Sequence, residues 1–272
     1  MAELPEIYKF AKQLNNELAG RTIEKVQVMQ EKCLNVDKST FENQILGSRI
    51  EEVFSKGKWI YIKLDKEKWL LVNLGMGADI NYNDGNKKPN GKFQFLFGLD
   101  DSTELYLRFW WFGHVHILSE KDLKEHKPTA STGLDPMDEN EFNMQNFLDL
   151  LENKRGSIKA FLLDQKNIAG IGNVYIHDIL FKARLHPLRK IKEMTRDEKL
   201  RLFDAIFENL HEAVKLGGIA YEKDIYGNRG KIIDFLVGYK EGLQCPNCAF
   251  EIEKIKTGGT SSYICPNCQS LP

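Results

Sequence analysis

Within this 272-residue chain, the spacing of hydrophobic residues changes from the period of strands to the period of helices at about its middle. Between positions 22 and 118, apolar and polar residues alternate in runs such as TIEKVQVM, WIYIKL, KFQFLF, ELYLRF and HVHIL. Alternation places the apolar side chains on one face of a strand. After position 141, the runs FNMQNFLDLL, SIKAFLLDQ and VYIHDILFKARL carry an apolar stripe at helical spacing. The sequence therefore predicts an α+β multidomain chain, with an antiparallel β-sandwich followed by a helical domain.

Two further helices have clear limits in the sequence. Residues 5–19 place five apolar residues at helical spacing before Gly20, which predicts one helix ahead of the sandwich. Thr195 and Glu198 form a capping-box pattern before LRLFDAIFENLHEAVKL, a segment that ends at two glycines.

The polar stretch 120–141 contains two prolines and a glycine, and we interpret it as the connection between domains. The predicted boundaries are 1–125 for the helix and β-sandwich, 126–141 for the linker, 142–238 for the helical domain and 239–272 for a small metal module.

Four of the five cysteines lie in the last 28 residues, as two C-P-N-C pairs. Each pair can bind one ion from a tight turn, and four thiolates form the tetrahedral sulfur set that zinc prefers. Cys245, Cys248, Cys265 and Cys268 are thus predicted to bind one structural Zn²⁺, with iron as the less favoured alternative. Between the pairs, FEIEKIK alternates and GGT suits a turn, which predicts a β-hairpin zinc finger. Cys33 stands apart and is interpreted as an inert thiol.

The composition limits the class of protein only loosely. A hydrophobic content of 42% with 28% charged residues is typical of globular proteins. No uncharged apolar run approaches the roughly 18 residues that span a bilayer, and the N-terminus lacks the apolar core of a signal peptide, so we expect a cytoplasmic protein. A net charge of −1 gives no global argument for nucleic-acid binding.

The opening MAELPEIYKF allows two interpretations. Glu3 and Glu6 flank Pro5 where acids stabilise a helix N-terminus and where proline fits the first turn. Alternatively, the start of the helix presents the α-amine as a reactive group, and the two acids take part in its reaction.

Several motifs in co-linear order resemble the formamidopyrimidine-DNA glycosylase/endonuclease VIII family of bacterial base-excision repair enzymes. They are AELPEIYKF, KGKW, NLGM, RFWWFGH, TGLDP, RGSIKAFLLDQ, AGIGNVYIHDILFKARLHP, LGG and the four-cysteine finger. The resemblance covers essentially the whole chain. It implies an N-terminal helix on a β-sandwich catalytic domain, a helix–two-turns–helix DNA-binding domain and a zinc finger.

The resemblance implies a DNA glycosylase with AP lyase activity, in which the N-terminal amine attacks C1′ of a damaged nucleoside. Ala2 occupies the nucleophile position after removal of Met1, and Glu3 matches the acid that protonates the opening sugar. Lys58 matches the lysine beside the lesion that contacts DNA phosphate, and we group it with the catalytic residues. Glu6 matches a second acid, to which we assign capping and positioning.

The resemblance also implies a set of DNA contacts. Met76, Trp111 and Phe112 match positions that enter the gap left by an everted base, while Trp110 is as readily a core residue. The phosphate contacts that it implies come from Lys154, Arg155, Asn173 and Lys240. The implied partner is damaged or abasic DNA, double- or single-stranded, bound by a monomer that works at the bacterial nucleoid and not at a membrane.

Two positions depart from the family pattern. Ala2 replaces the usual N-terminal proline, and Thr260 replaces an arginine five residues before the third cysteine. Two alternatives therefore stay open: a homologue that binds damaged, abasic or unusual DNA without base excision, and a zinc-dependent scaffold.

Overall fold

The computed structural model describes residues 2–84 and 91–271, and these form two compact units. The first unit contains residues 1–131 and 217–231, and the second contains 132–216 and 232–272. The sequence placed 217–231 in the helical domain, but this segment packs with the first unit.

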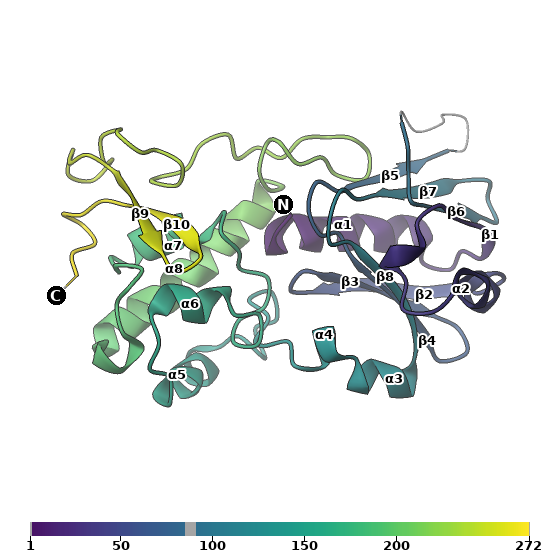
Figure 1. Cartoon of the computed structure of the whole chain (residues 1–272), viewed down its shortest axis with the longest axis horizontal. Helices are drawn as coiled ribbons and strands as arrows, with labels where there is room; N and C mark the ends of the chain where they lie inside the picture. The colour runs from purple at the N-terminus through teal and green to yellow at the C-terminus, as the bar shows by residue number, and fades with distance from the viewer. Residues whose placement is uncertain (1, 85–90, 272) are drawn as a thin grey trace. The chain divides into compact units, whose positions relative to one another are not determined.

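The first unit is a sandwich of two four-stranded antiparallel sheets, preceded by helix α1 (Leu4–Leu18) (Figure 1). One sheet has the order β1-β6-β7-β5 and the other β2-β3-β4-β8. The strands are β1 (Ile23–Val28), β2 (Ile50–Lys56), β3 (Trp59–Leu64), β4 (Lys68–Asn73), β5 (Asp79–Asn83), β6 (Phe95–Leu99), β7 (Glu104–Arg108) and β8 (His114–Ser119). The predicted alternating runs are thus strands, although KFQFLF contributes only its last three residues to β6.

Short helices complete the first unit at places where no helical pattern is present in the sequence. They are η1 (Glu31–Cys33), α2 (Lys38–Ile45), α3 (Glu120–Glu125) and α4 (Lys127–Ala130). Asp37 caps α2, and Ser119 caps α3, each through a side-chain oxygen that accepts a backbone N–H. Part of the stretch interpreted as a linker is therefore helical, and α3 packs on β8 and β4.

The second unit contains the helices and a terminal hairpin. Its elements are α5 (Met144–Glu152), α6 (Ile158–Leu163), α7 (Ile176–Lys182), η2 (Ile191–Glu193), α8 (Arg196–Lys215), β9 (Glu253–Thr257) and β10 (Thr260–Ile264). The predicted capping box is confirmed, because Thr195 Oγ1 accepts the Glu198 N–H and Glu198 Oε2 accepts the Thr195 N–H. The predicted hairpin is confirmed too, with Thr257 opposite Thr260 across its turn. None of the helices in the described part of the chain is long and apolar enough to cross a membrane.

The core of the sandwich is aromatic at its centre. Phe95 is fully buried, and its ring lies 6.0 Å from that of Phe41 and 5.9 Å from that of Phe109. Helix α1 packs around these rings through Ile7, Phe10 and Leu14. The inner residues of both sheets complete the core. Burial of this apolar surface stabilises the unit that carries the N-terminus.

We expect Phe95→Ala to destabilise the first unit by about 3–5 kcal/mol, because the lost ring leaves a cavity between two packed aromatic neighbours. Urea unfolding followed by tryptophan fluorescence measures this change. The exposed Met29 provides the control, since Met29→Ala removes an apolar side chain without opening a cavity. Equal midpoints for the two variants would contradict the packing role of Phe95.

Candidate functional site

The start of α1 buries two carboxylates. Glu3 and Glu6 are both almost wholly inaccessible to solvent, and Ala2 beside them is also buried. Glu6 Oε2 accepts the Glu3 N–H at 2.9 Å, so Glu6 caps the helix as the sequence predicted. Pro5 lies in the first turn, as its fixed φ favours.

The second oxygen of Glu6 is held by a distant segment of the same unit. Glu6 Oε1 accepts the Ile219 N–H at 3.0 Å. Gly218, in the LGG motif, has φ +83°, and a Cβ there would lie 2.4 Å from Glu6 Oε1. Only glycine therefore allows this backbone to approach the carboxylate so closely. The sequence showed the two glycines as a helix end but did not reveal this contact.

Lys58 lies in the Gly57–Lys58 turn between β2 and β3, as predicted, and is partly buried. Burial lowers the pKa of its amine, while the nearby carboxylates of Glu3 and Glu6 act in the opposite direction. The structure thus brings the predicted residues Glu3, Glu6 and Lys58 into one electrostatic cluster at the N-terminus of α1.

Asn73, at the end of β4, is a positioning residue that the sequence reasoning missed. Its Nδ2 donates to the backbone oxygen of Lys58 at 3.0 Å, and its Oδ1 accepts the Gly75 N–H at 3.0 Å. One side-chain amide therefore connects the Lys58 turn to the loop that carries Met76. The motif NLGM contained this residue, but only the fold shows its two partners.

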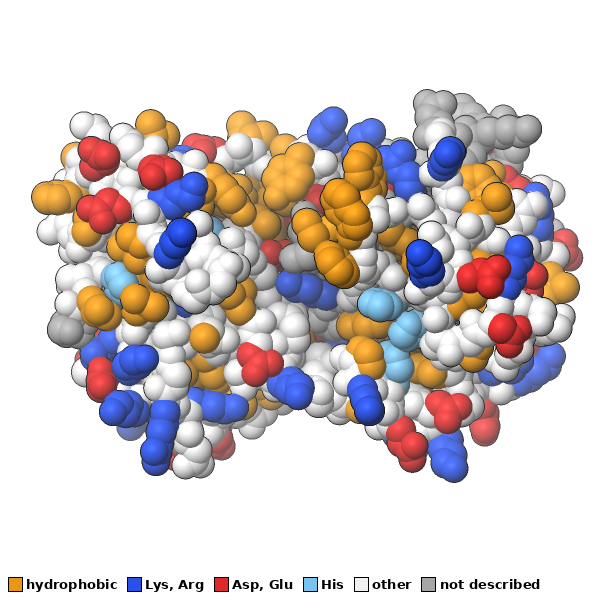
Figure 2. Space-filling model, viewed as in Figure 1, with side chains coloured by type: hydrophobic (Ala, Val, Ile, Leu, Met, Phe, Trp, Pro, Cys, Tyr) orange, Lys and Arg blue, Asp and Glu red, His pale blue; other side chains and the backbone are white. Residues whose placement is uncertain are grey.

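Met76 and the Trp110–Trp111–Phe112 run form an exposed patch, here called the aromatic loop patch. Met76 N–H donates to the Trp111 oxygen at 2.8 Å, and Trp110 N–H donates to the Met76 oxygen at 3.1 Å. Trp110 is 62% exposed, so the core interpretation of this residue is wrong. Hydrophobic side chains gather on the surface shown in Figure 2, and an apolar group of this kind indicates a binding surface.

The polar residues predicted to contact phosphate lie in the second unit, and two of them already have partners. Lys154 Nζ donates to Asn167 Oδ1 at 2.7 Å, and Lys240 Nζ pairs with Asp234 Oδ2 at 2.8 Å. Arg155 is exposed. Asn173 precedes α7, and its Oδ1 is buried with no hydrogen-bond partner among the described residues.

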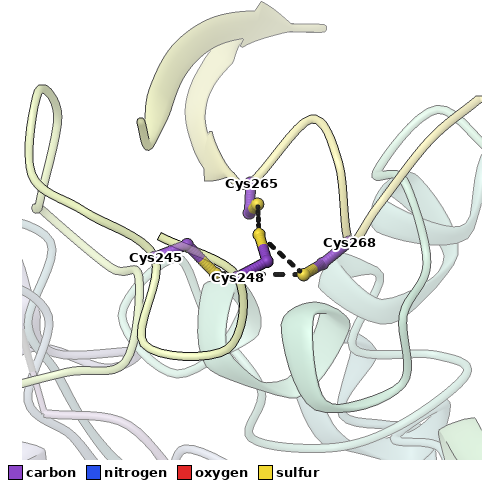
Figure 3. Close-up of side chains that lie close together, drawn as sticks. All are labelled: Cys245, Cys248, Cys265 and Cys268. Carbon is purple, nitrogen blue, oxygen red and sulfur yellow. Dashed lines mark hydrogen bonds between the residues drawn. The ribbon is translucent and has the colours of Figure 1, made fainter. Parts of the chain in front are cut away.

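The four finger cysteines point toward one another, as Figure 3 shows. The Sγ–Sγ distances are 3.4 Å for Cys248–Cys265, 3.5 Å for Cys248–Cys268 and 3.9 Å for Cys245–Cys268. A tetrahedron with Zn–S bonds of about 2.3 Å places its sulfurs roughly 3.8 Å apart, so the cluster fits one zinc ion. Cys33, by contrast, is partly buried in the first unit, where burial raises the pKa of its thiol.

Lys159 in α6 is the second residue that the sequence reasoning missed. Its ammonium is buried and donates to Thr257 Oγ1 at 3.1 Å, to the Ser261 oxygen at 2.6 Å and to Ser262 Oγ at 2.8 Å. Three oxygens of the hairpin thus satisfy the three donors of one lysine. This contact joins α6 to the zinc finger within the second unit.

Comparisons with known proteins agree with this architecture in each part of the chain. Residues 1–110 match the formamidopyrimidine-DNA glycosylase N-terminal domain, 132–224 match the H2TH domain of the same enzymes, and 242–271 match a zinc finger found in FPG and IleRS.

Relatives match over the whole length as well. The chain is 33% identical to a formamidopyrimidine-DNA glycosylase of Pelotomaculum thermopropionicum over 100% of both chains. It is 34% identical to one of Chloroflexus aurantiacus over 99% of this chain and 98% of the relative. A solved structure of Lactococcus lactis Fpg, in complex with DNA containing an abasic site, has a TM-score of 0.90 at 24% identity and covers 99% of this chain and 100% of its own. The protein belongs to the formamidopyrimidine-DNA glycosylase family.

We expect Gly218→Ala to destabilise the protein by roughly 1–3 kcal/mol, because alanine at this positive φ is strained and its Cβ displaces Glu6. Gly227→Ala is a matched control, since Gly227 has φ +89° and open space around its missing Cβ. Thermal unfolding should therefore show the larger loss in Gly218→Ala. Equal losses would mean that the Glu6 contact contributes nothing beyond backbone strain.

Burial lowers the pKa of Lys159 to about 8 from its ordinary 10.5. The unfolded chain then binds more protons between these values, so stability rises as pH increases from about 8 toward 10.5. We expect Lys159→Met to remove this rise, which is on the order of 1 kcal/mol between about pH 8 and pH 9.5. Urea unfolding at the two pH values measures it, with the exposed Lys256→Met as control. A rise that persists in Lys159→Met would refute the assignment.

Proposed function

We propose that this protein is a base-excision DNA glycosylase with AP lyase activity, in which the amine of Ala2 attacks C1′ of a damaged nucleoside. Membership of the formamidopyrimidine-DNA glycosylase family supports glycosylase activity. The observation that carries the proposed mechanism is the cluster at the start of α1, where Ala2 and Glu3 lie next to the anchored Glu6 and the Lys58 ammonium.

The chemistry of the cluster follows from the acidity of its groups. An α-amine has a pKa of about 7.7–8.0, so a useful fraction is an uncharged nucleophile near neutral pH. Its lone pair forms a bond to C1′ as the bond from C1′ to the base breaks, and the base leaves with the bonding electrons and takes up the proton that the amine loses. Glu3 protonates the sugar oxygen as the ring opens, which leaves a Schiff base between Ala2 and the sugar. The Schiff base acidifies the neighbouring carbons and permits elimination of the strand phosphates. Removal of Met1 is a condition of this route.

Alanine at the nucleophile position supplies a primary amine in place of the secondary amine of proline. A primary amine also forms a Schiff base, which can lose its N–H proton to give a neutral imine. The iminium from proline has no such proton and stays charged. We therefore propose an active enzyme whose elimination steps depend more strongly on Glu3 than those of a proline-initiated relative.

The aromatic loop patch is proposed to fill the gap left by the everted base. Base flipping costs a few kcal/mol of stacking and pairing, and inserted side chains offset part of that cost. Trp111 and Phe112 present ring faces that stack on any base, so recognition of the opposing base depends less on hydrogen bonds. This favours tolerance of unpaired or single-stranded substrates.

Phosphate binding is proposed for the second unit. Arg155 and Asn173 are assigned to phosphates directly, while Lys154 and Lys240 must exchange the partners Asn167 and Asp234 for DNA. Thr260 removes one arginine–phosphate contact, which reduces affinity rather than changing the reaction. Solved relatives from Lactococcus lactis hold DNA with an abasic site or with Fapy-dG, which supports damaged DNA as the partner here. We propose that the enzyme works as a monomer at the bacterial nucleoid, in the cytoplasm.

The zinc finger has a structural role in this proposal. Cys245, Cys248, Cys265 and Cys268 would hold one ion, and the bound zinc would stabilise the β9–β10 hairpin without taking part in bond breaking.

Borohydride trapping on an abasic oligonucleotide tests the proposal directly. With Met1 absent by intact mass, we expect a covalent adduct that peptide mapping assigns to Ala2. Glu3→Gln should reduce AP lyase product by about 100-fold or more, which is within the range of one acid–base group. Glu24→Gln, on the exposed face of β1, is the matched control.

A gel shift on the same DNA separates the alternatives. If processed protein shifts abasic DNA but gives no adduct, excision through Ala2 is refuted and the protein binds without base removal. If it gives neither adduct nor shift, the scaffold interpretation replaces both. The named relatives do not favour either alternative.

A further inference from the structure

Three histidines gather on the outer face of the β2-β3-β4-β8 sheet, next to Trp59 of β3. His114 and His116 are alternate residues of β8, so their side chains lie on the same face. His126 lies between α3 and α4, and its side chain is next to that of His116. The ring centroids of His116 lie 5.2 Å from His114 and 5.1 Å from His126. Figure 2 shows histidine side chains side by side on the visible surface.

Two of these rings already present nitrogens to each other. His116 Nδ1 lies 2.9 Å from His126 Nε2, and both side chains are partly buried. Two imidazole nitrogens bound to one tetrahedral zinc ion, each at about 2.0–2.1 Å, would be roughly 3.3 Å apart. A small rotation of either ring therefore opens the pair to a metal-binding distance.

One tautomer of His126 suits a ligand role. The Thr129 hydroxyl donates to the His126 backbone oxygen at 3.5 Å, and its oxygen lies 2.8 Å from His126 Nδ1. In the tautomer with the proton on Nδ1, His126 donates to Thr129 and its Nε2 lone pair faces His116. A hydrogen bond of this kind on the far nitrogen is what orients metal-binding histidines in other proteins.

The surroundings keep the two rings neutral, which is the form that binds metals. Burial, together with the neighbouring His126 and His114, lowers the pKa of His116 to about 4. Burial and His114 also lower the pKa of His126. Trp59 lies against all three rings, with centroid distances of 6.1, 5.9 and 5.6 Å, and covers the apolar side of the cluster.

We propose that His114, His116 and His126 form a second metal site, which takes one divalent transition metal of the zinc class. His116 binds through Nδ1, whose proton shifts to Nε2 of the same ring, and His126 binds through Nε2. His114 is exposed and turns toward the pair as the third ligand, while water takes the fourth position. Among groups of three or more potential ligands in the described residues, only the finger cysteines already have their ligand atoms within 4.8 Å of one another. Metal binding by the three histidines therefore requires a rotation of His114.

The site has a consequence for the fold. His126 begins the α4 turn, ten residues after His116 on β8. A metal bound by both would hold the α3–α4 segment against the sheet, over the small apolar cluster of Trp59, Leu71 and Leu118. The α3–α4 segment lies at the end of residues 1–131, after which the chain continues into the second unit. The metal would therefore stabilise the last part of the first unit before this point.

The test is a metal count on tag-free, zinc-loaded protein at about pH 7.5, in a buffer that does not bind metal. Native mass spectrometry with added Zn²⁺ should show two ions per chain, and calorimetry with Ni²⁺ should show one site besides the finger. We expect His126→Gln and His116→Gln to weaken the second site by about tenfold or more. His211→Gln, in α8, removes a histidine outside the cluster and should keep it.

Electron paramagnetic resonance of bound Cu²⁺ gives an independent readout, because coupling to two or three imidazole nitrogens marks the ligand set. His114→Gln tests the exposed ligand, whose loss leaves the packed pair intact. Thermal unfolding without added metal shows whether each variant is folded. One zinc per wild-type chain, or unchanged binding in the folded His114→Gln and His126→Gln variants, would falsify the site and leave a hydrogen-bonded histidine pair.

Discussion

The arrangement at the N-terminus depends on the buried carboxylate of Glu6. Its two oxygens accept backbone N–H groups from Glu3 and from Ile219, which are separated by more than two hundred residues in the chain. A buried carboxylate without such donors would be protonated or would not be tolerated. The pair of hydrogen bonds therefore fixes the beginning of α1 to the segment that follows α8. Ala2 and Glu3 take their positions from that attachment, and the Lys58 ammonium lies within electrostatic range of both acids.

The sequence was a good guide where the determining interactions are local. Alternation predicted the strands, the Thr195–Glu198 pair predicted the start of α8, and cysteine spacing predicted the metal-binding cluster. The missed features are long-range. Nothing near Lys159 in the sequence distinguishes it from an exposed helix lysine, because its partners Ser261 and Ser262 are about a hundred residues away. Asn73 likewise has its partners on two different loops. A helix of six residues such as α3 depends on a cap and on packing against β8. It is too short to show a periodic hydrophobic pattern in the sequence.

The contacts that support the site lie in the interior of the protein, whereas several residues proposed to touch DNA lie at its surface. Glu6, Gly218 and the four cysteines keep the contacts that hold the site and the finger together. Thr260 lies on the exposed side of the hairpin, and the tryptophans of the aromatic loop patch lie on the surface. Substitution at such positions changes what is bound with little effect on stability. Residues of the proposed contact surface can therefore change while the internal contacts that support the site stay intact.

The amide of Asn73 gives two loops a common mechanical support. Its nitrogen holds the turn of Lys58 and its oxygen holds the backbone before Met76, so neither loop can shift without breaking or dragging the other's hydrogen bond. One side chain thus lies between the loop of the exposed Met76 and the turn of Lys58, which is close to the two buried acids. In the proposed function, insertion of the aromatic loop patch into a bound strand would therefore be coupled through Asn73 to the turn that carries Lys58.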